Sequence, residues 1–150
     1  MALRDLHDGE RAQAERLAKV AGHASYPAFV AFIDVDRQRS ARQQTDLARI
    51  ARMLDAEPQG EPNIWMRAIL DDAGNDAATI AAGPLRDIAM IGALRKAKQS
   101  ERVSYETAIA LADRLELDEA CATLTRIRDE EQQADETLAR LLVQLCGEEH

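Results

Sequence analysis

Residues 91–115 read IGALRKAKQSERVSYETAIALADRL. Side chains three and four positions apart lie on one face of a helix, and here such a face can be followed without a break. That face carries Ile91, Leu94, Lys98, Glu101, Tyr105, Ala108, Ala112 and Leu115. Its apolar members predict a long helix packed against a protein core. Lys98 and Glu101 therefore fall at core positions.

Three other segments show the same apolar face interrupted by charged residues. In residues 2–22 the face consists of Leu3, Leu6, Glu10, Ala14, Leu17 and Val20. In residues 27–54 it consists of Phe29, Ile33, Asp36, Arg39, Gln43, Leu47, Ile50 and Leu54. In residues 119–146 it consists of Ala120, Leu124, Ile127, Glu131, Asp135, Leu138, Leu142 and Leu145. Four long amphipathic helices with one longer connection predict an all-α four-helix bundle.

Composition agrees with a single helical domain over residues 1–150. The chain is 46% hydrophobic but only 3% aromatic, and it lacks β-branched runs bounded by turns. Its net charge of −8 argues against nucleic acid or an anionic membrane surface as a partner. No stretch resembles a signal peptide or a membrane span, so we expect a cytoplasmic protein. Cys121 and Cys146 lie too far apart on one helix to pair, which predicts free thiols.

The connection between the second and third long helices contains the clearest loop. Residues 56–63 read AEPQGEPN, with two prolines and a glycine. After this loop we expect a short helix that begins near Pro62 or Asn63 and ends at Gly74, then a second short turn that stops at residues 83–84. Trp65, Met66 and Met90 are interpreted as packing residues at the end of the bundle.

Each long helix contributes acids near its middle. These acids are Glu10, Asp36, Glu101, Glu131 and Asp135. Converging carboxylates build two-metal centres in four-helix bundles, usually with a Glu-x-x-His pair on two helices. That pair is absent, because none of His7, His23 and His150 follows a glutamate at this spacing. His7 lies one turn before Glu10 and could face the same pocket, but we expect an exposed or partly buried position at the surface.

Two cations, Arg39 and Lys98, share these faces with the acids. A positive side chain at a ligand position repels a metal dication and fills its space. Interior charges are tolerated chiefly when they are paired, so we predict that both cations lie inside the bundle within ion-pair reach of Glu10, Glu101 or Glu131. We expect no catalytic residue, since the chain has no nucleophile beside a base and no phosphate-binding loop.

Several stretches resemble one known family. They are LRDLHDGERA (3–12), YPAF (26–29), NIWMRAILDDAG (63–74), YETAIALADRLELDEA (105–120) and RDEEQQADETLARL (128–141). Together they are similar to the YciF-type ferritin-like proteins, small bacterial stress-associated proteins whose domain is otherwise of unknown function. The resemblance runs from about residue 3 to residue 142.

The resemblance implies a ferritin-like bundle, commonly dimeric, with short extra helices between the second and third long helices. It also implies a carboxylate-bridged two-metal centre in typical members. The family's ligand positions that remain acidic here are Glu10, Glu101, Glu131 and Asp135. Two further ligand positions fall on Arg39 and Lys98, which are cationic, and a third falls on Gln43.

Our leading hypothesis is therefore a non-enzymatic, stress-associated bundle with a degenerate two-metal centre, in which Arg39 and Lys98 replace ligand carboxylates. It implies no cofactor and a possible homodimer. An alternative is an active di-iron or di-manganese oxidase or peroxidase, with metal held by Glu10, Glu101, Glu131 and Asp135. A third hypothesis is a protein-interaction module that uses the Pro-rich loop and Trp65.

Overall fold

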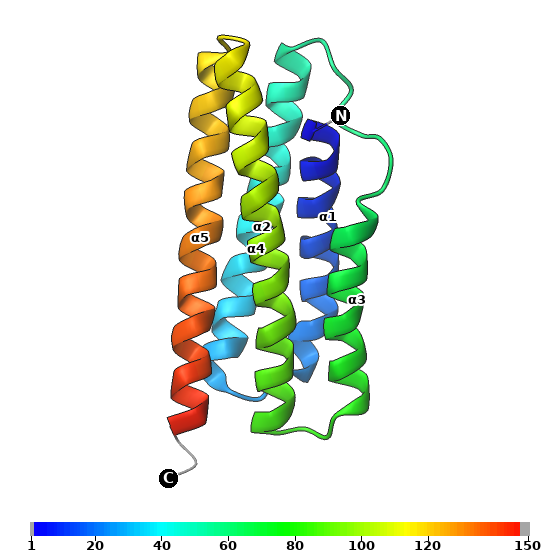
Figure 1. Ribbon diagram of the computed structural model, residues 1–150. Helices are drawn as coiled ribbons and strands as arrows, with labels where there is room; N and C mark the ends of the chain where they lie inside the picture. Colours follow the sequence, from blue (N-terminus) through cyan, green and yellow to red (C-terminus); the bar gives the residue numbers. More distant parts are fainter. Residues whose placement is uncertain (1, 148–150) are drawn as a thin grey trace.

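The computed structural model describes residues 2–147, and all regular structure in that range is helical (Figure 1). The elements are α1 (Ala2–Val20), the 3₁₀ turn η1 (Ala21–His23), α2 (Pro27–Met53), α3 (Ile64–Thr79), α4 (Pro84–Arg114) and α5 (Asp118–Gly147). The prediction of an all-α bundle is confirmed.

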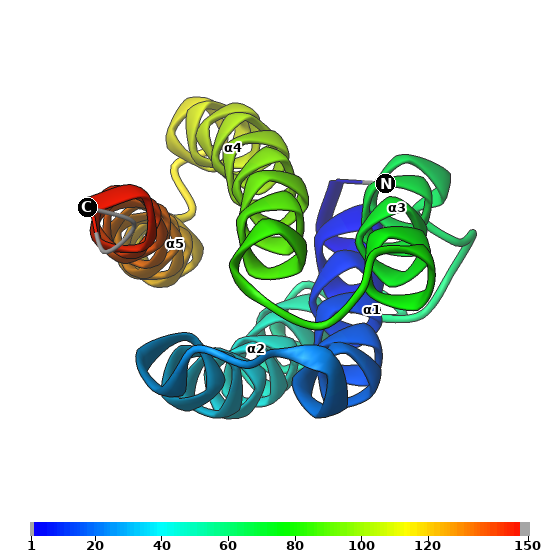
Figure 2. The ribbon, with the colours of Figure 1, turned by 90° about the horizontal axis from the view of Figure 1, so that it is seen from below.

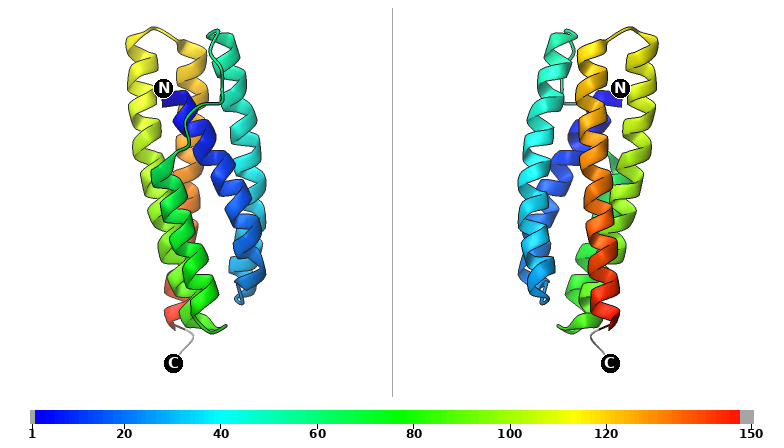
Figure 3. Two further views of the ribbon diagram at one scale, coloured as in Figure 1. Left: turned by 90° about the vertical axis from the view of Figure 1, so that its right-hand side faces the viewer. Right: turned by 90° about the vertical axis from the view of Figure 1, so that its left-hand side faces the viewer.

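The bundle consists of α1, α2, α4 and α5, with neighbouring helices antiparallel (Figures 1 and 2). The short helix α3 lies outside the bundle, packed along α1 and α4. The connection from α2 to α3 crosses the outside of α1 before α3 begins (Figure 3). This long connection lets α2 and α4 run in the same direction, as in ferritin-like bundles.

Local sequence signals explain where the helices begin. Pro27 and Pro84 open α2 and α4, where the missing N–H of proline costs nothing. The Asn63 side chain caps α3 by accepting a hydrogen bond from the Met66 N–H at 3.0 Å. The predicted start of α3 is therefore confirmed.

The predicted end of α3 at Gly74 is wrong, because one continuous helix runs to Thr79 and replaces the two expected short elements. Its buried face continues past the glycine, through Met66, Leu70, Ala73 and Ala77. A glycine inside a helix costs only about 1 kcal/mol relative to alanine. Packing of Ala77 against the bundle outweighs that cost.

The core is divided into two apolar clusters. One contains Leu17, Phe29, Leu94 and Leu138 and lies toward the end where α1 meets α2. The other contains Leu6, Leu47, Tyr105 and Leu124 and lies at the opposite end. Between these clusters lie the buried charged residues Glu10, Asp36, Lys98, Glu101, Glu131 and Asp135, which form the polar layer, whereas the buried Asp87 lies outside it at the start of α4. The polar layer is thus flanked by hydrocarbon on both sides.

Three predicted packing positions are wrong. Leu54 is 38% exposed and Leu115 is 66% exposed, because each follows the last residue of its helix. Trp65 is 76% exposed, since α3 packs with Met66 inward and turns the preceding residue outward.

Cys121 and Cys146 are free, as expected. None of the helices in residues 2–147 has the length and apolar character needed to cross a bilayer.

Candidate functional site

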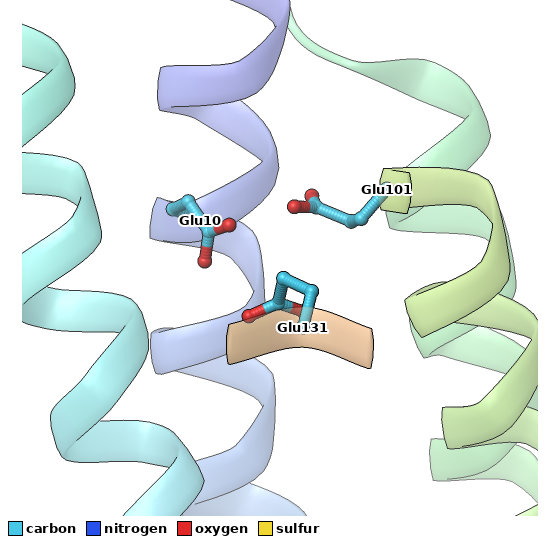
Figure 4. A group of neighbouring side chains, drawn as sticks. All are labelled: Glu10, Glu101 and Glu131. Atoms are coloured by element: carbon cyan, nitrogen blue, oxygen red, sulfur yellow. The ribbon is translucent and has the colours of Figure 1, made fainter. Parts of the chain in front are cut away.

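Three glutamates converge at the centre of the polar layer. Glu10 comes from α1, Glu101 from α4 and Glu131 from α5, and their carboxyl groups point toward one another (Figure 4). Their exposed fractions are 0%, 2% and 0%. One carboxylate oxygen from each lies within 4.8 Å of the other two. Within residues 2–147, this is the only such group of candidate metal ligands.

Lys98 supplies the positive charge of this layer. It lies one turn before Glu101 on α4, and its side chain is 1% exposed. Its Nζ lies 2.8 Å from Asp36 Oδ2 and 2.9 Å from Glu131 Oε2. It also donates a hydrogen bond to Gln13 Oε1 at 2.9 Å. The predicted interior position of Lys98 beside an acid of the layer is confirmed.

Arg39 does not share this position, and its predicted contact with Glu10, Glu101 or Glu131 is wrong. Its side chain is 20% exposed, and its Nη1 pairs with Asp36 Oδ1 at 3.0 Å. The next residue, Ser40, takes the fully buried place on α2. Residues 39 and 40 both fit the helical spacing after Asp36, and the longer side chain reaches the edge of the bundle.

Asp135 is buried but is directed away from the three glutamates. Its carboxylate accepts hydrogen bonds from Arg95 Nε at 2.8 Å and Gln99 Nε2 at 2.7 Å, both from α4. Gln43 on α2 likewise donates to Glu130 Oε2 at 3.0 Å, outside the group of three. The structure therefore brings together three of the four acids that the family resemblance placed at ligand positions.

Two residues position the glutamates. The Tyr105 hydroxyl donates to Glu10 Oε1 at 2.8 Å, which fixes the Glu10 carboxyl group. Gly9 lies in the middle of α1, where a Cβ would stand 2.5 Å from Glu101 Oε1. A glycine at this point lets the Glu101 carboxyl group approach the α1 backbone. Gly9 was missed at the sequence level, although a glycine inside an otherwise strong helix is itself a signal.

Electrostatics of the layer favour protonated carboxyl groups. Burial raises the pKa of Glu10 well above its usual value, and the neighbouring Glu101 raises it further. Burial also raises the pKa of Glu101, to about 7, and that of Glu131 rises despite the pull of the Lys98 ammonium. Burial alone would lower the pKa of Lys98, but Asp36 and Glu131 raise it, so Lys98 stays charged.

Each of the three glutamates also has a buried oxygen that accepts no hydrogen bond. These oxygens are Glu10 Oε2, Glu101 Oε2 and both oxygens of Glu131, of which Oε2 is ion-paired with Lys98. Burying a carboxylate oxygen without a hydrogen-bond donor costs free energy of folding, so these oxygens need a proton or a cation between them. A proton meets that need in part, since burial and the neighbouring Glu101 raise the pKa of Glu10 well above its usual value.

The residues present do not fit a two-metal centre. Lys98 fills one side of the layer with a fixed cation, Asp135 is held by Arg95, and no histidine ligand atom joins the group among the described residues. Glu10, Glu101 and Glu131 can each offer one carboxylate oxygen, within 4.8 Å of the other two, to a single small cation.

His7 is buried at 5% exposure, so its expected surface position is wrong. Burial lowers the pKa of its imidazole, with Arg11 acting in the same direction.

Gln13, like Gly9, is a residue of the polar layer that the sequence did not single out. It lies three positions after Glu10, while the alternative Ala14 lies four positions after it, and only the structure shows which one faces Lys98.

A family model for the domain of unknown function DUF892 matches residues 1–150. The chain belongs to this family. Since the match spans the whole chain, the DUF892 assignment covers every helix that builds the polar layer. No curated protein matches the sequence.

Two solved structures share the fold. The E. coli stress protein YciF is 21% identical, with a TM-score of 0.93 over 97% of this chain and 92% of YciF. YcfI of Rhodopseudomonas palustris, for which a structural role has been suggested, is 23% identical, with a TM-score of 0.87 over 92% of this chain and 88% of YcfI. These matches confirm the YciF-type fold that the sequence resemblance implied.

Proposed function

We propose that this protein is a non-enzymatic, stress-associated structural protein of the bacterial cytoplasm, with a degenerate two-metal centre. One observation carries the proposal: the Lys98 ammonium lies within 2.9 Å of carboxylate oxygens from both Asp36 and Glu131 at the centre of the bundle. Lys98 thereby takes the place of a metal charge and lets the bundle fold without metal.

Repulsion from the Lys98 ammonium disfavours a second metal ion in the layer. Two unit charges 4 Å apart repel by about 4 kcal/mol at an effective dielectric constant of 20, and a dication doubles this repulsion. A second metal beside Lys98 would meet that repulsion in a fully buried layer. Paired metals that activate oxygen are thus disfavoured, which argues against the oxidase and peroxidase alternative.

The contacts of Arg39 and Asp135, at two other ligand positions of the family, support the same proposal. Arg39 has its own partner in Asp36, and it lies at the edge of the layer. Asp135 is paired with Arg95 and Gln99 instead of facing the layer. The stress association is proposed because YciF, which has the same fold, is a stress protein.

A charge-reversal experiment tests the replacement. Lys98→Glu adds a fifth carboxyl group to Glu10, Asp36, Glu101 and Glu131 at the centre of the layer, so the metal-free variant should melt well below the wild type. Manganese or ferrous iron should restore much of the lost stability, because a dication that binds only the folded state stabilises it by mass action. The matched control is Lys96→Glu, at an exposed position two residues earlier on α4. If Lys98→Glu melts like the control with and without metal, the replacement account is wrong.

A second candidate function, a protein-interaction module, is supported by exposed apolar side chains at the start of α3. Ile64 is 69% exposed and Trp65 is 76% exposed. We propose that a second copy of the chain covers them. Sedimentation velocity should then show a dimer that weakens in Trp65→Ser, with Trp65 fluorescence shifting to the red on dilution. Equal sedimentation of both proteins at every concentration would remove this candidate.

A further inference from the structure

An apolar cavity lies at the end of the bundle where α1 begins. This helix starts at Ala2, short of the ends of α2, α4 and α5 (Figures 1 and 3), so one corner of the bundle is open there. The cavity in this corner has a volume of about 400 Å³. Cavities that hold small ligands in proteins measure about 300–1,000 Å³, so this one has room for a ligand.

The walls of the cavity are mostly apolar. Ala108 and Ala112 of α4 and Ala120 of α5 line its inner part, and all three are buried. Alanines at these inward positions leave open the space that larger side chains would fill. Leu111 and Leu115 line the mouth, where they are 51% and 66% exposed. Apolar surface in contact with water is unfavourable, so the cavity favours an occupant with an apolar body.

A positioned arginine stands at the edge of the cavity. Arg4 lines it, and its Nε donates a hydrogen bond to the Glu57 carbonyl oxygen at 3.0 Å. A Cβ on Gly60 would stand 2.6 Å from Arg4 Cδ, so the loop after α2 packs closely against the stem of this side chain. Within residues 2–147, Arg4 makes no ion pair. Its planar guanidinium suits a ligand carboxylate, which can accept two parallel hydrogen bonds.

Glu57 is the other charged residue that lines the cavity. Its side chain is exposed and does not pair with Arg4, so water solvates the carboxylate. The cation is therefore the charged group that the surrounding chain holds in place, while the acid is free to turn toward solvent. This difference favours an anionic ligand over a cationic one.

We infer that the cavity binds one free fatty acid of medium chain length, with its carboxylate on Arg4 and its alkyl chain against Ala108, Ala112 and Ala120. A free acid is favoured over a membrane lipid, because the net charge of −8 opposes approach to an anionic membrane surface. The cavity is separate from the polar layer. The inference therefore goes beyond the proposed function and does not depend on it.

Isothermal titration calorimetry with decanoate, below the concentration at which it forms micelles, tests the inference. The wild type should bind one decanoate per chain, with the negative heat-capacity change that marks burial of apolar surface. Octanoate should bind about fifteenfold more weakly, since each buried CH₂ group changes the affinity about fourfold. Decyltrimethylammonium, a cation with the same alkyl chain, should bind more weakly than decanoate.

Arg4→Gln tests the charged end of the site. It should weaken decanoate binding by about fivefold, the upper value for an exposed ion pair. Binding of decanol, which has the same chain without the charge, should not change. Arg42→Gln removes an exposed arginine of α2 and is the matched control.

Ala112→Leu tests the apolar end. The larger side chain would fill the cavity, so decanoate binding should fall by about tenfold or more. Ala110→Leu, at an exposed position on the same helix, should bind like the wild type.

Three results would overturn the inference and leave the proposed function standing. One is a wild type that binds no decanoate or binds decyltrimethylammonium more tightly. Another is equal decanoate binding by Arg4→Gln and the wild type. The third is a dimer, seen by sedimentation velocity, that blocks decanoate binding as the protein concentration rises, because a second copy of the chain would then cover the cavity.

Discussion

Asp8 and Glu10 are two residues apart on α1, and both are buried, yet their carboxyl groups are in opposite situations. Asp8 accepts hydrogen bonds from the Asn63 N–H at 2.6 Å and from Arg67 Nη2 at 2.7 Å, and Arg11 adds a third at 2.6 Å. Glu10 accepts a hydrogen bond from the Tyr105 hydroxyl, and another acid, Glu101, lies beside it.

Their pKa values move in opposite directions for this reason. Burial by itself would raise the pKa of Asp8, but the hydrogen bonds from Arg67 and Asn63 hold it below its usual value. Burial raises the pKa of Glu10 well above its usual value, and Glu101 adds to the rise. The donors to Asp8 therefore outweigh its burial, whereas at the more deeply enclosed Glu10 burial and the neighbouring acid prevail.

The difference separates two kinds of buried acid. The donors to Asp8 include Asn63 and Arg67, at the start of α3, so this acid attaches the outer helix to the bundle. Asp87 does the same elsewhere, accepting from the N–H groups of Ser25 and Tyr26 at the turn between α1 and α2. The central glutamates accept fewer hydrogen bonds, and several of their buried oxygens are left without a donor.

Removing Lys98, the cation at the centre of the layer, should lower the free energy of unfolding the most. Lys98→Ala leaves Asp36 and Glu131 without their buried partner, and breaking a buried ion pair in this way costs about 3–5 kcal/mol. Urea denaturation measures the loss. Lys96→Ala, which changes an exposed lysine on the same helix, should stay within about 0.5 kcal/mol of the wild type. A similarly small loss in Lys98→Ala would show that the central acids are solvated.

The next effect concerns pH and distinguishes the two kinds of acid directly. In the folded protein Glu10 and Glu101 keep their protons to higher pH, and the pKa of Glu101 is about 7. In the unfolded chain both groups release their protons above about pH 4.5. The folded state therefore binds more protons, and its free energy of unfolding should fall as the pH rises from about 5 to 7. Each such group contributes up to about 1.4 kcal/mol per pH unit.

Asp8 adds nothing to that slope. Its lowered pKa gives stability that is present throughout this range and is lost only when the pH falls below about 4. Urea denaturation across the pH range should show a shallower slope in Glu101→Gln than in the wild type. A flat or rising wild-type profile between pH 5 and 7 would mean that the central glutamates are ionised in the folded protein.

Asp8→Asn should have a smaller effect than loss of Lys98. It weakens charged hydrogen bonds from Arg67 and Arg11, whose side chains are 25% and 42% exposed, so about 2 kcal/mol is expected. Asp5→Asn, at an exposed position on α1, is the control. Hydrogen exchange should locate the loss in α3. A uniform loss across all helices would contradict an anchoring role for Asp8.

Tyr105→Phe should have the smallest effect. It removes one hydrogen bond to Glu10 without changing the size of the side chain by more than an oxygen atom. The expected loss is about 1 kcal/mol, since this is the usual net value of such a bond. Thermal unfolding at neutral pH measures it, and a loss equal to that of Lys98→Ala would place more of the layer's stability on Tyr105 than we propose.

Helical spacing predicted the bundle and the interior position of Lys98, because a repeat of apolar residues fixes which face of a long helix is buried. Spacing could not decide between residues 39 and 40, or between residues 13 and 14, since both members of each pair fit one turn after an interior acid. It also could not predict that Arg95 would draw Asp135 away from the layer, because that contact joins two helices. The buried face of a helix can be predicted from that helix's own sequence, whereas the contact partners of its side chains depend on how the helices pack together.

The metal content of the whole protein tests the central claim most directly. Protein purified without chelator, from cells grown with added iron and manganese, should carry no more than one metal ion per chain. It should also lack the absorption band of an oxo-bridged metal pair, because Lys98 occupies the side of the layer where a second ion would lie. Two ions per chain with such a band would contradict the account and favour an active two-metal oxidase.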